Sequence, residues 1–237
     1  MLITGIKSKP VYAPLHADVR GRYHLMLGHG AGGVALLRVL AELERSAPAA
    51  LASTRVLFLP QPMMAAPASA ATASSATDAL ATGAPAGGTP ESGGADAPRD
   101  PTRELRSLAL AGLELFDRVP ALLERFRGLL EGALMGTRLY VAGPESFIGL
   151  AMKIALEFNL NKDEIRAEEL GSLARRVYCI HCRATAEDVR TNIVECPGCR
   201  RWLLVRDHYS RRLAAYMGVM ADAEAPGELP PVREVFV

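Results

Sequence analysis

The chain has 237 residues, of which 49% are hydrophobic, and a formal net charge of +1. This apolar content supports a core and excludes wholesale disorder, while the near-neutral charge excludes a surface built throughout for nucleic acid or acidic lipid. No apolar stretch reaches the ~20 residues that span a bilayer, and no secretory signal is evident at the N-terminus. We therefore expect a cytoplasmic protein of one or two domains that does not bind membranes.

The first part of the chain shows a β-α-β pattern. An apolar run over residues 23–27 predicts a buried strand, and helical spacing over residues 34–43 predicts a helix. A second apolar strand is expected over residues 55–59, where Pro60 ends it. Strand, glycine-rich turn, helix and strand together are the beginning of an open parallel sheet.

The turn between that first strand and helix is rich in glycine. Gly28, Gly30 and Gly33 match the dinucleotide pattern G-x-G-x-x-G, and Gly32 adds a further glycine. Such a turn lets a pyrophosphate approach the backbone N–H groups at the start of a helix. His29 is the one histidine placed to face a ligand there, although a solvated loop histidine is the simpler interpretation. Glycines that serve packing alone are the alternative to a nucleotide site.

Residues 65–101 form an insertion built almost wholly from Ala, Pro, Ser, Thr and Gly, with one leucine and no aromatic residue. This composition cannot offset the ordering cost of ~1–2 kcal/mol per residue, so we expect disorder there. The βα alternation resumes after the insertion. Apolar spacing predicts helices over residues 105–116 and 120–134, a strand at 139–142, a helix at 145–158 and a strand near 165–170. Residues 1–171 are therefore expected to form one α/β domain with an open parallel sheet.

Four cysteines lie in two C-x-x-C pairs, Cys179–Cys182 and Cys196–Cys199. Each pair lets two thiolates from one tight turn reach the same ion, and Pro197-Gly198 is suitable turn chemistry. The spacing predicts a tetrahedral four-thiolate site in a small unit over residues 172–212. A unit of this length is too short to be stable without a cross-link such as a bound metal ion. Disulfides or four inert thiols are the alternatives.

The choice of metal rests on the residue that follows each pair. Iron sites of the rubredoxin type usually have glycine there, whereas this chain has Arg183 and Arg200. This difference favours zinc over iron. With four thiolates available, His181 is expected to be a surface residue rather than a ligand.

Charge is uneven near the C-terminus. Residues 172–212 contain nine Arg and four acidic residues, whereas the tail at 213–237 has four acidic residues and one Arg. A small zinc-ribbon unit with this excess of arginine can bind nucleic acid, but few aromatic side chains are available to stack on bases. An acidic partner subunit, or the chain's own tail docking in extended form, is at least as well supported.

The segment Leu139-Tyr-Val-Ala-Gly-Pro-Glu-Ser-Phe147 and the helix after it resemble the closing β-α-β of the pyridine-nucleotide half of ferredoxin–NADP reductases. The glycine-rich turn lies where the first glycine loop of that family would be. The resemblance implies an NAD(P)H site that includes Gly143 and Pro144. Two features depart from the family: Ala142 replaces its cysteine, and no flavin-binding R-x-Y-S/T motif is visible.

Both C-x-x-C pairs, the run of residues 203–218 and the Pro-rich acidic end resemble the C-terminal domain of the dimethylamine monooxygenase small-subunit family. The resemblance implies an accessory subunit of a multi-component, NAD(P)H-dependent monooxygenase whose other subunits are its partners. No catalytic constellation is visible in this chain. A nucleic-acid-binding regulator and a rubredoxin-like iron electron carrier are the alternative hypotheses, and we favour nucleic acid least as a partner.

Overall fold

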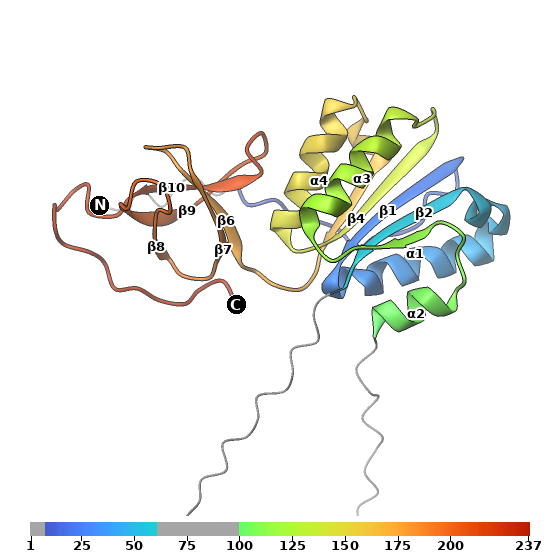
Figure 1. Ribbon diagram of the computed structural model, residues 1–237, viewed down its shortest axis with the longest axis horizontal. Helices are drawn as coiled ribbons and strands as arrows, with labels where there is room; N and C mark the ends of the chain where they lie inside the picture. The colour runs from blue at the N-terminus through green and yellow to red at the C-terminus, as the bar shows by residue number, and fades with distance from the viewer. Residues whose placement is uncertain (1–7, 61–99) are drawn as a thin grey trace, which may run out of the picture. The chain divides into compact units, whose positions relative to one another are not determined.

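The computed structural model describes residues 8–60 and 100–237 (Figure 1). The described residues 8–60 and 101–237 belong to one compact unit. The predicted disordered insertion at 65–101 lies almost entirely outside the described residues, so it stays a prediction. No described helix has the length and apolar content needed to cross a membrane.

The first sheet has five strands, which are all parallel to their neighbours in the order β3-β2-β1-β4-β5. Their bounds are β1 Tyr23–His29, β2 Thr54–Leu59, β3 Leu113–Leu115, β4 Thr137–Gly143 and β5 Ile165–Glu169. The strand order reverses direction between β1 and β4, so the carboxyl ends of these two strands mark the switch point where open α/β sheets hold ligands. The predicted α/β fold with an open parallel sheet is confirmed.

Helices cover both faces of this sheet (Figure 1). Alternate residues of the strands point to opposite faces, so two hydrophobic cores form. One core joins Leu27 and Val141 to Phe126 and Phe147, and the other joins Met26 and Tyr140 to the helix after β1. The helices are α1 Gly33–Ser46, α2 Pro101–Ser107, α3 Val119–Glu131 and α4 Glu145–Glu157, with 3-10 turns at Gly30–Gly32, Pro48–Ser53 and Lys162–Glu164.

The single helix predicted over residues 105–116 is wrong. The helix ends at Ser107, and residues 113–115 form the edge strand β3 beside β2. Two local features explain the break. Ala109 adopts a left-handed φ of 47°, and Gly112 lies so close to β2 that a Cβ there would be 2.3 Å from the carbonyl oxygen of Thr54. Pairing with β2 therefore overrides the helical spacing of the leucines.

The second sheet contains the cysteines and has the order β7-β6-β10-β9-β8. Its strands are β6 Arg175–Cys179, β7 Thr185–Val189, β8 Ile193–Glu195, β9 Trp202–Ser210 and β10 Ala215–Met220. All neighbours are antiparallel except β6 and β10, which run parallel. Val177, Val205 and Tyr216 lie in its core. The domain boundaries at 171/172 and 212/213 stay predictions.

The C-terminal tail packs along the second sheet. The backbone amide of Asn192 donates to the carbonyl of Arg233 at 3.0 Å, and the amides of Val235 and Phe236 donate to the carbonyl of Arg190 at 2.9 and 3.0 Å. The guanidinium of Arg175 lies 3.8 Å from the centroid of the Phe236 ring. The apolar end of the tail thus has a binding surface within its own chain.

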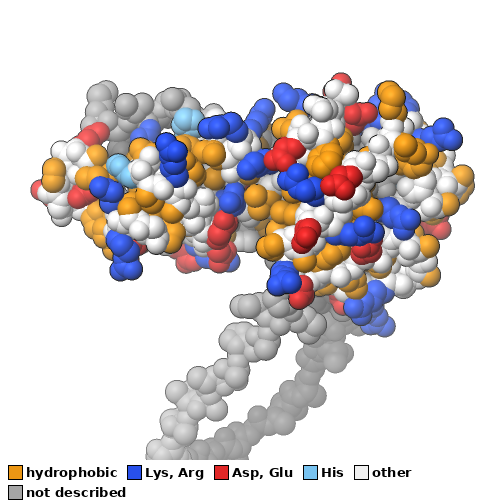
Figure 2. Space-filling view, turned by 45° about the horizontal axis from the view of Figure 1, so that its top comes forward, with side chains coloured by type: hydrophobic (Ala, Val, Ile, Leu, Met, Phe, Trp, Pro, Cys, Tyr) orange, Lys and Arg blue, Asp and Glu red, His pale blue; other side chains and the backbone are white. Residues whose placement is uncertain are grey.

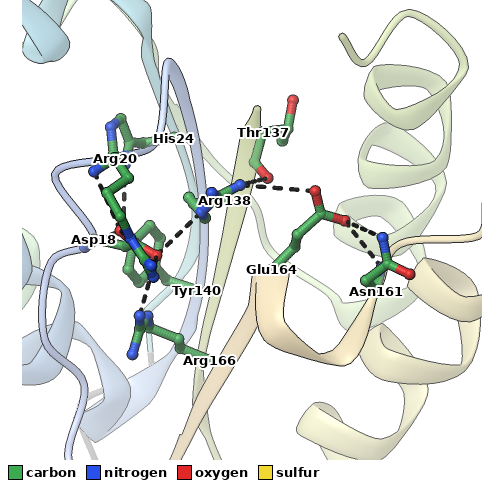
Figure 3. A network of polar contacts seen from close by, with 9 residues as sticks. All are labelled: Asp18, Arg20, His24, Thr137, Arg138, Tyr140, Asn161, Glu164 and Arg166. Carbon is green, nitrogen blue, oxygen red and sulfur yellow. Dashed lines mark hydrogen bonds and ion pairs between the residues drawn. The ribbon is translucent and has the colours of Figure 1, made fainter. Parts of the chain in front are cut away.

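A buried ionic network ties the segment before β1 to the first sheet (Figure 3). The Asp18 carboxylate is 3% exposed, and it accepts hydrogen bonds from Arg20, Arg138 and Arg166 at 2.9 to 3.1 Å. The Tyr140 hydroxyl accepts from the backbone amide of Asp18 at 2.9 Å. The residues before Asp18 contact β5, where the amide of Leu15 donates to the Glu168 carboxylate and Lys9 pairs with Glu169 at 3.7 Å.

Candidate metal centre

The four cysteines come together at one end of the second sheet. Cys179 is the last residue of β6, and Cys182 follows it in the turn before β7. Cys196 directly follows β8, and Cys199 lies in the turn that leads to β9. All four sulfur atoms lie within 4.8 Å of one another, and no other described residues with metal-ligating side chains form a comparable group of three or more. The structure therefore brings the two predicted pairs to one point.

The sulfur atoms fit a tetrahedral ion. Sγ of Cys179 lies 3.8 Å from Sγ of Cys199, and Sγ of Cys182 lies 3.4 Å from Sγ of Cys196. A tetrahedron with metal–sulfur bonds of about 2.3 Å has sulfur–sulfur edges of roughly 3.8 Å. All four cysteines are free thiols rather than disulfides. The donor set is the one that zinc or a single iron prefers.

Each C-x-x-C pair forms a tight turn that closes on the residue after it. The amide of Arg183 donates to the carbonyl of Cys179 at 3.0 Å, and the amide of Arg200 donates to the carbonyl of Cys196 at 3.1 Å. Both arginines have a left-handed backbone, with φ of 67° and 62°. This conformation costs a non-glycine residue roughly 1–2 kcal/mol. The two arginines therefore adopt the turn that glycine would form most easily, so the turn shape by itself does not select zinc over iron.

The four cysteines differ in how deeply they are buried. Cys179 and Cys196 are fully buried and pack with Leu203, whereas Cys182 is exposed. Burial raises the pKa of the Cys179 thiol, and the backbone amide of Arg201 lowers the pKa of the Cys199 thiol. A bound cation would hold all four as thiolates. His181 is exposed and lies outside the group of four sulfurs.

The glycine-rich turn lies at the switch point of the first sheet, but its glycines have packing roles. A Cβ at Gly28 would be 2.7 Å from Leu36, and one at Gly33 would be 2.5 Å from Pro101. A Cβ at Gly32 would be 2.1 Å from the carbonyl oxygen of Ala142, and Gly30 has a φ of 55°. The four glycines lie at the junction of β1 and α1, as the sequence predicts. Packing or backbone conformation explains the presence of each glycine, and nucleotide binding there stays a prediction.

Gly143 and Pro144 lie beside that turn. A Cβ at Gly143, whose φ is 152°, would be 3.1 Å from Cβ of His29. The His29 ring packs edge-on against Phe147 with centroids 5.6 Å apart. Its Nδ1 is buried with no hydrogen-bond partner among the described residues, and burial lowers its pKa. His29 is thus a neutral, half-buried ring rather than a solvated loop residue.

Sequence reasoning missed a buried polar cluster at the start of α4. Glu145 is 4% exposed, and both of its carboxylate oxygens lack hydrogen-bond partners among the described residues. Burial raises the pKa of Glu145 to about 7. Tyr209 of β9 lies close by, since a Cβ at Gly149 would be 2.2 Å from its hydroxyl and 3.3 Å from Oε1 of Glu145. The sequence signal was a carboxylate directly after a Gly-Pro turn, which is also an ordinary start of a helix.

Four of the nine arginines in residues 172–212 pair with acidic residues of the same segment. Each of its four acidic residues forms an ion pair with an arginine of the same segment; the pairs are Arg175–Asp207, Arg176–Glu187, Arg190–Asp188 and Arg200–Glu195. On the face shown in Figure 2, Lys and Arg side chains are interspersed with acidic and apolar ones. That face has no continuous basic surface.

A doubly wound parallel sheet followed by a small sheet with four converging thiols defines an α/β protein with a candidate metal centre. Two family models match the chain: dimethylamine monooxygenase subunit DmmA-like, N-terminal domain, over residues 4–85 and 92–165, and the corresponding C-terminal domain over residues 176–219. The chain belongs to this family of dimethylamine monooxygenase subunits.

A curated relative is the heme-dependent oxidative N-demethylase delta subunit of Ectopseudomonas mendocina (strain ymp), which is 36% identical over 97 residues. The match covers 41% of this chain and 55% of that protein, so the chain spans about half the length of the relative.

Similar solved structures include the ferredoxin reductase of carbazole 1,9a-dioxygenase, with 12% identity and a TM-score of 0.37 over 67% of this chain and 34% of that chain. Phthalate dioxygenase reductase has 14% identity and a TM-score of 0.40 over 73% and 45% of the two chains.

Proposed function

We propose that this protein is an accessory subunit of a multi-component, NAD(P)H-dependent oxidative N-demethylase that acts on dimethylamine or a similar amine. The observation that carries the proposal is the convergence of four thiols in a chain whose two matched regions belong to one family of monooxygenase subunits. The curated relative is itself one subunit of a heme-dependent N-demethylase. On this proposal the other subunits are cytoplasmic partners and carry the oxygen-activating chemistry.

Cys179, Cys182, Cys196 and Cys199 would hold one zinc ion, which supplies a structural cross-link rather than a reaction step. The core beside the site is small, consisting of Cys179, Cys196 and Leu203 among the buried residues. A core of that size does not hold several turns in place by itself. Zinc binding of about 10 kcal/mol would fix the two turns and the ends of β6, β8 and β9 that carry them.

The first sheet would support electron transfer or subunit docking. Residues 28–33 span the end of β1, the 3-10 turn and the start of α1, and they lie with Gly143-Pro144 at the switch point between β1 and β4. The form of electron-transfer support that we propose is therefore NAD(P)H binding at this point. Fluorescence titration of the purified protein with NADPH tests it. Saturable binding that a His29→Ala variant weakens would support a nucleotide site, and absence of binding would leave the domain as a docking surface.

Two other functions predict different behaviour. A nucleic-acid-binding regulator would show affinity that falls steeply with salt. A rubredoxin-like iron carrier would be red when purified and would bleach on reduction. The zinc proposal expects a colourless protein.

The experiment that tests the proposed function is isolation of the affinity-tagged chain from its native organism. We expect co-purifying subunits and NAD(P)H oxidation that depends on added dimethylamine. A strain that lacks the chain should lose this activity and recover it with the wild-type gene. If the chain elutes alone and amine oxidation proceeds at the normal rate without it, the proposed function is wrong.

A further inference from the structure

A cavity of about 410 Å³ lies beside the outer edge of the first sheet. It is open to solvent on one side and is lined by the segment before β1, one face of α4, the edge strand β5 and the end of β9. The lining includes Tyr12, Met152, Lys162, Arg166, Tyr209 and Arg211. The volume falls within the ~300–1,000 Å³ typical of small-molecule sites.

The walls of the cavity are mainly apolar and are held in place by their own contacts. Met152 and Leu156 come from α4, and Ile165 and Ala167 come from β5. The segment that forms the opposite wall is fixed at both ends. The amide of Leu15 donates to the Glu168 carboxylate, and the amide of Ser8 donates to the carbonyl of Asp207 at 3.0 Å. The cavity therefore exists before any ligand enters, which lowers the cost of binding.

The charged side chains that line the cavity are all cationic. They are Lys162, Arg166 and Arg211, and no acidic residue is among the lining residues. Arg166 bonds Asp18 through one terminal nitrogen, but its Nε is buried without a hydrogen-bond partner among the described residues. Within the described chain, neither Lys162 nor Arg211 forms an ion pair at salt-bridge distance. The lining thus carries positive charge from Lys162 and Arg211, while the Glu145 and Glu169 carboxylates lie behind it, near Tyr12.

Two phenols add hydrogen-bonding capacity. Tyr209 is 6% exposed and lines the cavity, and its hydroxyl lies near the Glu145 carboxylate. Its hydroxyl lies against Gly149, which also lines the cavity. Burial and the nearby Glu145 raise the pKa values of Tyr209 and Tyr12 above their ordinary range, so both phenols keep their protons and can donate them to an acceptor.

We infer that this cavity is a binding site for a small apolar molecule with one anionic group, such as a medium-chain or aromatic carboxylate. The apolar walls would take the hydrocarbon part, and Lys162 and Arg211 would hold the anion by charge-assisted hydrogen bonds. The same cations repel alkylammonium ions, so the cavity is not a site for an amine substrate. The inference rests on the lining residues alone and stands independently of the proposed subunit function.

The experiment is calorimetric titration of the full-length protein with octanoate, octylammonium and 1-octanol at equal ionic strength. We expect saturable binding of octanoate with one site per chain, weaker binding of octanol and no measurable binding of octylammonium. The double variant Lys162→Gln/Arg211→Gln should weaken octanoate binding at least about tenfold. Arg212→Gln changes a neighbouring exposed arginine that does not line the cavity, and should bind octanoate normally.

A second variant separates the cavity from general surface charge. Ala13 is exposed and lines the cavity, so Ala13→Trp places a bulky ring there with little effect on the core. It should abolish octanoate binding while its thermal unfolding stays close to wild type. Equal binding of octanoate and octylammonium, unchanged binding by both cavity variants, or no saturable octanoate binding by the wild type would each overturn the inference.

Discussion

A Cβ atom at Gly32 would lie 2.1 Å from the carbonyl oxygen of Ala142 and 2.8 Å from the amide nitrogen of Gly143. The turn after β1 and the end of β4 therefore meet backbone to backbone at the switch point of the sheet. Only glycine permits this approach, because a methyl group cannot displace a strand held on both sides by hydrogen bonds. The glycine-rich turn is thus needed for packing, whether or not a nucleotide binds beside it.

Substitution of Gly32 by alanine should destabilise the protein by about 2–3 kcal/mol, since the added methyl group overpacks against backbone atoms. Urea unfolding measures the change. Gly128 in α3 has no atom within 4 Å of a Cβ position, so Gly128→Ala should be neutral or stabilise by up to about 1 kcal/mol. Equal stability of the two variants would show that the approach of the two backbones is not tight.

Replacement of Glu145 by glutamine should make the protein more stable at pH 8 and change its stability little at pH 4.5. Burial raises the pKa of this carboxyl to about 7 in the folded protein, so folding favours the protonated form. The resulting penalty is absent below the unfolded pKa of about 4.3 and grows as the pH rises to 7. The full shift corresponds to roughly 3 kcal/mol.

Denaturant unfolding of wild type and Glu145→Gln across pH 4.5 to 8 checks this pH dependence. The difference between the two proteins isolates Glu145 from other titrating groups, including the thiols. Glu157 at the other end of α4 is 43% exposed and paired with Arg127, so Glu157→Gln is the matched control at an exposed carboxylate of the same helix. A stability difference that stays constant over this range would contradict the burial of an uncompensated carboxyl group.

Asp18→Asn should destabilise the protein by roughly 3 kcal/mol at pH 7, because it leaves guanidinium groups around a neutral, nearly buried side chain. Hydrogen bonds from Arg20, Arg166 and Arg138 hold the pKa of Asp18 far below its usual range. Its contribution is therefore complete above the unfolded pKa of about 4 and is lost as the pH falls further. Thermal unfolding at pH 7 measures the loss.

The matched control for Asp18 is Asp188, whose carboxylate is 70% exposed and pairs with Arg190 at 3.3 Å. Exposed pairs of this kind contribute about 0–1 kcal/mol, so Asp188→Asn should change stability little. If Asp18→Asn is equally mild, the network in Figure 3 does not hold the segment before β1 in place.

The sequence predicted most of the strands and helices, but not the place where a tertiary contact overrides the local pattern. Runs of apolar residues at strand length predicted β1, β2 and β4, because a parallel strand is buried on both faces. The leucines at 105 and 115 share helical spacing, yet Leu115 belongs to β3. The left-handed backbone at Ala109 and the close approach of Gly112 to Thr54 explain the difference.

The sequence predicts the metal centre but not the buried polar cluster. Two C-x-x-C pairs predict convergence from spacing alone, since each turn is local and one ion satisfies both. The approach of Tyr209 in β9 to Glu145 at the start of α4 joins residues 64 positions apart, and no local pattern signals it. The pairing of Arg175 with Asp207 and of Arg176 with Glu187 also joins residues on different strands, which composition does not reveal.

Elemental analysis of the folded, reduced protein tests the central claim that four thiols hold one structural ion. We expect a colourless protein with one equivalent of zinc, loss of that zinc in a Cys179→Ser/Cys196→Ser variant, and loss of structure in the second sheet when a chelator removes the metal. A fully folded protein that contains no metal while all four thiols are reduced would contradict the account.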